Sequence, residues 1–229
     1  MVVASNRASG RYRTEIEITR AINDSSTGDS SPLIKSGVLP DFFARIDKDQ
    51  PVSIFDAGPA AAKSLDFFNQ FKSHIYVADL YDSLPVLDEG YGELADQHKL
   101  SLWEKHFRGM LSLKKGVRFD LFLFWDIPCL LDRFAMQALL KVLSPAITGS
   151  SYAHCFAFHS ARHVSTFHRY ALENETTIHA MPIASVERGK AIQNQKDVER
   201  IMHLFTVTTS VLHANGKVEI GLKGSPAGS

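Results

Sequence analysis

The chain has 229 residues, enough for one α/β domain with an arm, and 25 lysine and arginine residues balance 25 aspartate and glutamate residues. A formal net charge of zero argues against broad electrostatic binding to nucleic acid or to an anionic membrane. No apolar run approaches the roughly 18 residues of a membrane span, and no signal-peptide pattern opens the chain. Because Cys129 and Cys155 form no CxxC pair, we expect both to be reduced and the protein to be cytoplasmic.

Polar residues dominate the first part of the chain and predict a flexible N-terminal arm over residues 1–31. Apolar residues at helical spacing then predict a helix at 38–47, within a segment over residues 32–50 that packs on the core. Residues 51–229 are expected to form the main α/β domain.

Strands and helices alternate in the first part of that domain. We expect strands at 52–56, 74–79, 119–125 and 152–158, with helices at 60–71, 93–113 and 133–143. The third of these strands is nearly all apolar, which is typical of a parallel strand buried on both faces.

The pattern changes after residue 159. A short strand at 176–181 and a helix at 195–204 are expected there. Asn215-Gly216, between the apolar runs 205–213 and 217–222, predicts an antiparallel hairpin at the end of the chain.

The turn after the first strand is the most informative stretch. The apolar run 52–55 ends in Asp56, and a turn containing Gly58 leads into a helix; about twenty residues later, a second apolar run ends in Asp79. This order is typical of a site for a nucleoside cofactor, in which the turn presents N–H groups and the second acid accepts hydrogen bonds from ribose. A nicotinamide dehydrogenase is disfavoured, because Ala60 and Lys63 stand where GxGxxG needs glycines.

Residues 50–223 resemble the class I methyltransferases that use S-adenosylmethionine. Three segments carry the resemblance in the family's order, namely 52–58, 74–79 and 119–145. The resemblance implies an α/β fold with a doubly wound, mostly parallel sheet that ends in an antiparallel hairpin. It also implies S-adenosylmethionine as cofactor and methyl transfer to an unknown small-molecule or protein acceptor.

The same resemblance assigns residues to the cofactor site. Asp56 would lie near the cofactor's amino group or hold the turn, Asp79 would bind the ribose hydroxyls, and Trp125 would line the methyl-transfer cavity. The expected cofactor-binding residues are Asp56, Ala57, Gly58, Pro59, Ala60, Asp79, Leu80, Phe124 and Trp125.

Methyl transfer needs an oriented nucleophile and, for a protonated acceptor, a base. Asp126, after the central strand, and His159, after the fourth strand, are the candidate catalytic residues. His159 and His163 are four residues apart, but no third ligand is evident, and we expect no metal site.

A catalytically silent protein of the same fold is the alternative. The turn has one glycine, Gly58, where such loops usually carry two or three, and no base is clear from the sequence. Such a protein would serve as a binding, scaffolding or regulatory module. The C-terminal hairpin would then offer a sheet edge to a protein partner or to a second copy in a homodimer.

Overall fold

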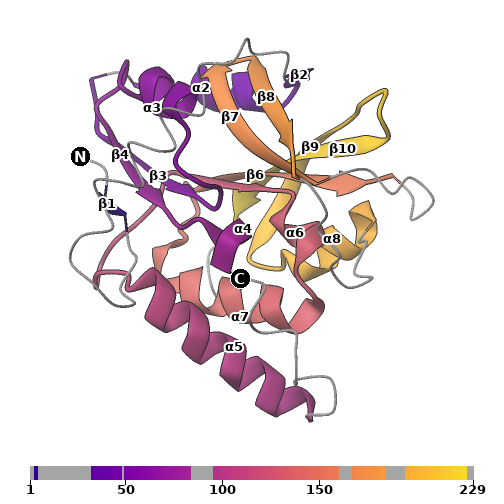
Figure 1. The fold of residues 1–229 in the computed structure, drawn as a ribbon. Coiled ribbons are helices and arrows are strands. Elements are labelled where there is room, and N and C mark those ends of the chain that lie inside the picture. The colour runs from indigo at the N-terminus through magenta and orange to yellow at the C-terminus, as the bar shows by residue number, and fades with distance from the viewer. Residues whose placement is uncertain are drawn as a thin grey trace.

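Figure 1 shows the fold of the chain in a computed structural model, which describes residues 3–4, 32–47, 49–83, 95–159, 167–183 and 194–225. The predicted arm over residues 1–31 lies outside the described residues, apart from the two-residue strand β1 (Val3–Ala4). No helix of the described part of the chain is long and apolar enough to cross a membrane.

A seven-stranded sheet forms the middle layer, in the order β1-β4-β3-β5-β6-β10-β9. Strands β1, β4, β3, β5 and β6 are parallel, whereas β10 pairs antiparallel with both β6 and β9. This arrangement confirms the predicted fold class, a doubly wound, mostly parallel sheet that ends in an antiparallel hairpin. The bounds are β3 (Val52–Asp56), β4 (Ser73–Val77), β5 (Leu121–Trp125), β6 (Tyr152–Phe158), β9 (Phe205–Leu212) and β10 (Lys217–Gly224).

Helices cover both faces of this sheet (Figure 1). In that view α5 (Asp96–Leu111), α7 (Arg133–Leu143) and α8 (Gln195–Ile201) lie on the lower face, and α2 (Leu39–Phe43) and α3 (Ala62–Phe68) lie on the upper face. Helix α2 is shorter than the predicted helix at 38–47. The connecting helices are α4 (Leu80–Ser83), α6 (Ile127–Leu130) and the 3₁₀ helix η2 (Ser144–Ala146).

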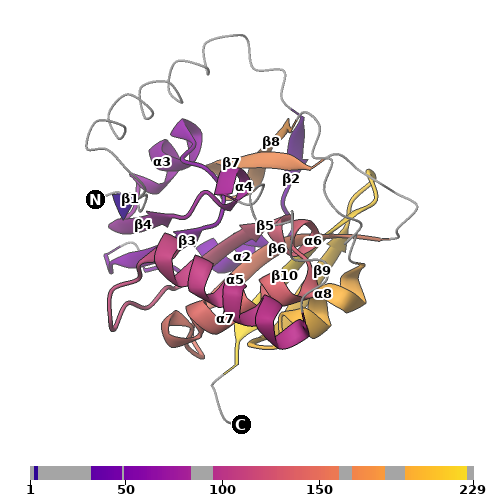
Figure 2. The ribbon, with the colours of Figure 1, turned by 60° about the horizontal axis from the view of Figure 1, so that its bottom comes forward.

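A second, three-stranded antiparallel sheet covers part of the upper face, and we call it the cap. Its strands are β2 (Leu33–Lys35), β8 (Thr177–Pro182) and β7 (His168–Asn174), in that spatial order. Only β8 was predicted from the sequence. Both views place the cap opposite α5 and α7 (Figures 1 and 2). The N–H of Leu172 donates to Oγ of Ser64 at 2.9 Å, which ties the cap to α3.

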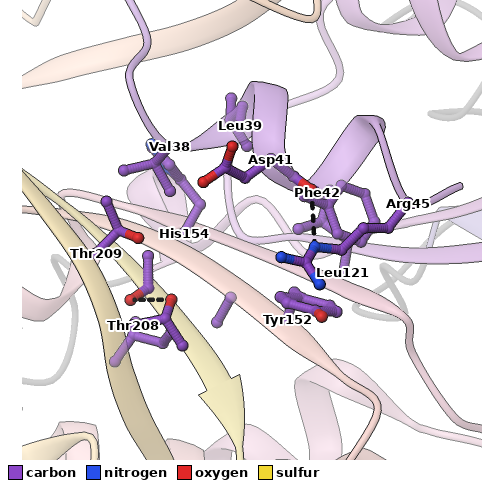
Figure 3. Close-up of a pocket in the computed structure, with 13 residues that line it drawn as sticks. Val38, Leu39, Asp41, Phe42, Arg45, Leu121, Tyr152, His154, Thr208 and Thr209 are labelled. Carbon is purple, nitrogen blue, oxygen red and sulfur yellow. Dashed lines mark hydrogen bonds between the residues drawn. The ribbon is translucent and has the colours of Figure 1, made fainter.

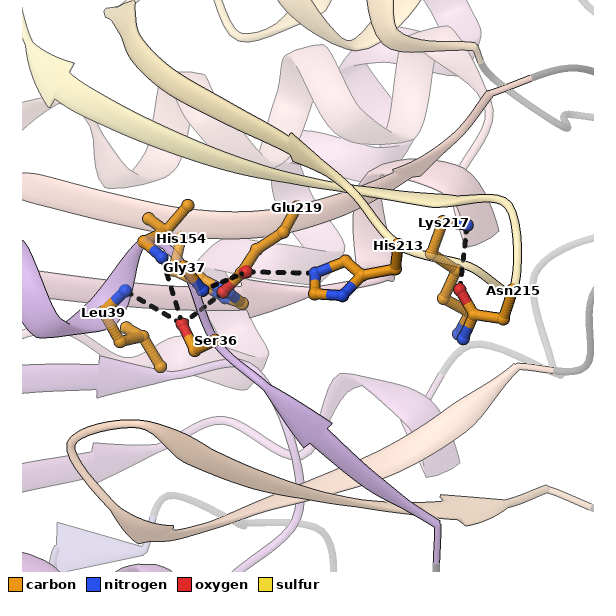
Figure 4. Close-up of polar contacts among 9 residues, drawn as sticks. Ser36, Gly37, Leu39, His154, His213, Asn215, Lys217 and Glu219 are labelled. Carbon is orange, nitrogen blue, oxygen red and sulfur yellow. Dashed lines mark hydrogen bonds and ion pairs between the residues drawn. The ribbon is translucent and has the colours of Figure 1, made fainter.

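A buried carboxylate joins the N-terminal segment to the large sheet (Figure 4). Glu219, on β10, accepts hydrogen bonds from the hydroxyl of Ser36 and from the N–H of Gly37, the latter at 2.9 Å. Its two oxygens also lie 2.8 Å from Nε2 of His154 and 3.1 Å from Nε2 of His213. Burial alone would raise the pKa of Glu219, but the hydrogen bonds from His154, His213 and Ser36 bring it below its usual range.

The variant Glu219→Ala tests whether this cluster holds the segment around Ser36 and Gly37 on the large sheet. We expect the free energy of unfolding to fall by about 3–5 kcal/mol, because the buried histidine and serine lose their common acceptor. Urea denaturation at neutral pH measures the change. Lys223→Ala, at an exposed position of the same strand, is the control and should stay within about 0.5 kcal/mol of wild type. Equal, small losses in both variants would contradict a structural role for the cluster.

Candidate functional site

The predicted cofactor turn lies at the carboxyl edge of the large sheet, directly after β3. The side chain of Asp56 is buried, and its Oδ1 accepts a hydrogen bond from the N–H of Gly58 at 2.9 Å. The N–H of Ala57 donates to the carbonyl of Leu123, and the N–H of Leu80 donates to the carbonyl of Ala57, both at 2.9 Å. The ends of β3, β4 and β5 are therefore bonded together around the turn.

Asp79 lies beside the turn, as the predicted spacing requires. Its N–H donates to the carbonyl of Gly58 at 3.2 Å, and its side chain is half-buried. The backbone of Asp79 is left-handed, with φ of 45°. A non-glycine residue in this region carries strain, and such residues gather at functional sites. The role of Asp79 at a ribose stays a prediction.

Trp125 occupies the space in front of Gly58. Its Nε1–H donates to Oδ1 of Asp56 at 2.7 Å. A Cβ added at Gly58 would lie 3.2 Å from both Cδ1 and Nε1 of the indole. In this position the indole fills the space beside Gly58 that a cofactor would need. The residues at the turn therefore do not fit the predicted cofactor while Trp125 lies there.

The other expected contacts divide between the site and the core. Pro59 and Ala60 are half-buried residues of the turn, and their contact with a cofactor stays a prediction. Phe124 points to the opposite face of the sheet, where it stacks on Phe122 at 5.7 Å between ring centroids and meets Phe205 edge-on. The structure therefore does not bring the side chain of Phe124 to the turn.

The carboxyl group of Asp56 is a buried charge. Burial raises the pKa of Asp56 to about 6, although the hydrogen bonds from Trp125 and Gly58 lower it; repulsion from Asp79 raises it further. A buried carboxylate with a raised pKa at a strand end is typical of a ligand-binding or catalytic site.

Asp126, the first candidate base, is surrounded by donors and only 1% exposed. The hydroxyl of Tyr81 donates to its Oδ1 at 2.5 Å. Oδ2 accepts from the hydroxyl of Tyr170 at 3.0 Å and from the N–H of His168 at 3.1 Å, and it lies 3.7 Å from Nζ of Lys217. Both carboxylate oxygens of Asp126 therefore already accept hydrogen bonds from the protein's own groups. A catalytic role for Asp126 stays a prediction.

Lys217 is a buried cation beside Asp126 that the sequence did not predict. It is 1% exposed, and its Nζ donates to the hydroxyl of Tyr170 at 2.6 Å and lies 3.0 Å from Nδ1 of His168. Burial lowers the pKa of Lys217, against the opposing effect of Asp126. Polar and apolar residues alternate along β10, which is typical of a strand with one solvated face, so the sequence offers no sign that Lys217 is covered.

His159, the second candidate catalytic residue, is exposed beyond the end of β6. Its N–H donates to the carbonyl of Gly216 at 2.9 Å, beside the C-terminal hairpin. Because β6 is two strands away from β3, the structure does not bring His159 to the turn. His163 lies outside the described residues.

A cavity of about 190 Å³ lies away from the turn, between α2 and the strands β6, β9 and β10 (Figure 3). Leu121 and Tyr152, the first residues of β5 and β6, are part of its lining, together with Phe42 and Arg45 of the N-terminal segment. The cavity therefore lies beside the amino ends of β5 and β6, whereas the candidate site lies at the carboxyl ends of the strands.

Comparison with known proteins gives structural neighbours only. No protein-family model and no curated protein matches the chain. A TehB-like S-adenosylmethionine-dependent methyltransferase from Corynebacterium glutamicum is 11% identical, with a TM-score of 0.46, over 92% of this chain and 97% of that one. A 1,6-didemethyltoxoflavin-N1-methyltransferase from Burkholderia thailandensis, with bound S-adenosylhomocysteine, is 13% identical, with a TM-score of 0.41, over 77% and 72%. Similarity at this level carries no argument about function, and the fold class rests on the strand order.

Replacing Asp56→Asn tests the buried charge. A carboxyl group whose pKa rises from 3.8 to about 6 on folding stabilises the protein at low pH, and this contribution is lost as the pH rises through that window. Asparagine keeps an oxygen acceptor for Trp125 and Gly58 but does not ionise. We expect the stability of wild type relative to Asp56→Asn to fall by about 1 kcal/mol from pH 5 to pH 8.

Urea denaturation at the two pH values measures this difference. Asp66→Asn, at an exposed position on α3, is the matched control and should show no such pH dependence. A stability difference between wild type and Asp56→Asn that is the same at both pH values would show that Asp56 titrates normally.

Proposed function

We propose that this chain binds S-adenosylmethionine at the carboxyl edge of β3 and β4 and is a methyltransferase that acts on a small-molecule or protein acceptor. The observation that supports the proposal is the gathering of strain and buried charge at that edge. Asp79 and Trp125 both have left-handed backbones, with φ of 45° and 54°, and they flank the buried carboxylate of Asp56. Each feature lowers stability, and folds retain such features where they bind ligands.

Under this proposal, Asp79 and Asp56 contact different parts of the ligand. The carboxylate of Asp79 accepts hydrogen bonds from ribose hydroxyls, and that of Asp56 faces the cationic amine. When bound, the cofactor supplies an activated methyl group. In the form described here the ligand does not fit while Trp125 covers Gly58, so we derive no catalytic step through it.

A second candidate function is a catalytically silent binding, scaffolding or regulatory module. The position of Trp125 and the enclosure of Asp126 by Tyr81 and Tyr170 favour it. Strand β9 lies at the end of the described sheet and carries no charged residue, and its Leu212 is 59% exposed. Such an edge suits pairing with a protein partner or with a second copy in a homodimer.

Isothermal titration calorimetry with S-adenosylhomocysteine, the demethylated product, tests the binding proposal. We expect saturable heat, and Asp79→Ala should weaken binding by about tenfold because it removes a charged acceptor of hydrogen bonds. Asp66→Ala, at an exposed position on α3, is the control and should bind like wild type.

Two results would count against this proposal in different ways. Unchanged affinity in Asp79→Ala would contradict the site assignment and leave the binding itself intact. Absence of heat and of any thermal shift at about 1 mM ligand, in wild type and in Trp125→Gly alike, would contradict the function and favour the second candidate.

A further inference from the structure

Trp125 reaches the turn because β5 is irregular at its end. Its φ of 54° is left-handed, and the register between β5 and β6 shifts between Leu123 and Trp125. A bulge of this kind changes the direction of the side chain that follows it. The indole consequently lies over the end of β3, where it bonds to Asp56.

The indole covers both groups that a ligand at this turn would need. Its Nε1–H uses the same carboxylate oxygen of Asp56 that receives the N–H of Gly58. Its Cδ1 and Nε1 atoms also lie against the only position of the turn from 57 to 61 that has no Cβ. A ligand with a cationic amine therefore competes with Trp125 for Oδ1 of Asp56 and for the space beside Gly58.

The cap holds the indole from the other side. The ring of Tyr170, on β7, stacks on Trp125 with centroids 5.2 Å apart and an interplanar angle of 14°. The hydroxyl of Tyr170 is fixed in turn by its bonds to Asp126 and Lys217. The side chain of His154 meets the indole edge-on at 5.4 Å.

We propose that Trp125 sets the affinity of this chain for its adenosyl ligand, because it must leave Asp56 and Gly58 before the ligand enters. Tyr170 links this movement to the cap. The proposal rests on the proposed function. The strained backbone at Trp125 favours the movement, since a tryptophan that leaves the left-handed region recovers that strain.

Calorimetry with S-adenosylhomocysteine on the full chain compares three variants with wild type. Trp125→Gly removes the indole and places glycine at a positive φ, and we expect it to bind about tenfold more tightly or better. Trp125→Phe loses the hydrogen bond to Asp56 but keeps a ring, so its affinity should lie between the two. Trp103→Phe, buried on α5 across the large sheet from the cap (Figure 1), is the control and should bind like wild type.

A fluorescence measurement keeps the test independent of how well the glycine variant folds. The chain has two tryptophans, so Trp103→Phe leaves Trp125 as the only one. Trp125 is fully buried, and its emission should therefore be that of an apolar environment. Addition of S-adenosylhomocysteine should shift this emission to longer wavelength as the indole leaves the turn.

The outcomes separate the inference from the function on which it rests. Tighter binding by folded Trp125→Gly, together with the emission shift, supports the inference. Equal affinity in wild type and Trp125→Gly, or binding without any change in emission, overturns it and leaves the proposed function standing. Absence of binding in wild type and in folded Trp125→Gly contradicts the proposed function, and the inference with it.

Discussion

The upper face of the large sheet holds charged side chains out of water, and this desolvation is the constraint on which the rest of the structure depends. Glu219 and Lys217, both on β10, are at most 1% exposed. A buried charge costs several kcal/mol unless partners compensate it. Glu219 has two histidines and the Ser36 hydroxyl, and Lys217 has Tyr170 and the nearby Asp126. These pairs join the N-terminal segment, the sheet and the cap, because each needs donors or acceptors from at least two of them.

Asp56 is buried in the same layer but has a different kind of partner. Its bonds come from the neutral Nε1–H of Trp125 and N–H of Gly58, and among the described residues it forms no ion pair with a cationic side chain. The pKa of Glu219 accordingly falls below its usual range, whereas that of Asp56 rises to about 6. A ligand amine would complement a carboxylate that lacks a cationic partner, and the proposed binding of S-adenosylmethionine would supply such an amine.

The large sheet was predictable from the sequence because its signals are local. Apolar runs marked β3 to β6, and Asn215-Gly216 marked the hairpin. The cap was not fully predictable, because polar and apolar residues do not alternate along β7 (His168–Asn174). In addition, β8 pairs with both β7 and β2, and β2 is distant from β8 in the sequence. The burial of Lys217 follows from the cap and was therefore missed with it. Trp125 was expected at the site, but its left-handed backbone was not, since residue type does not favour that conformation in tryptophan.

The sequence suggests that residues of the turn itself hinder cofactor binding, whereas in the structure a side chain from another strand, Trp125 of β5, also lies against Gly58. Alanine and proline stand after Gly58 where glycines are usual, and Pro59 and Ala60 are half-buried. The nearest atoms to a Cβ added at Gly58 are Oδ1 of Asp56 and two indole atoms of Trp125 on β5, each at 3.2 Å. The difference matters because the backbone of the turn is fixed by its hydrogen bonds, whereas a side chain from a neighbouring strand can leave by rotation and a local backbone change, as we propose for Trp125. Under our proposal, ligand affinity at the turn depends on two sets of contacts. The indole contacts Asp56 and Tyr170, and a cationic nucleoside ligand must replace these contacts with its own.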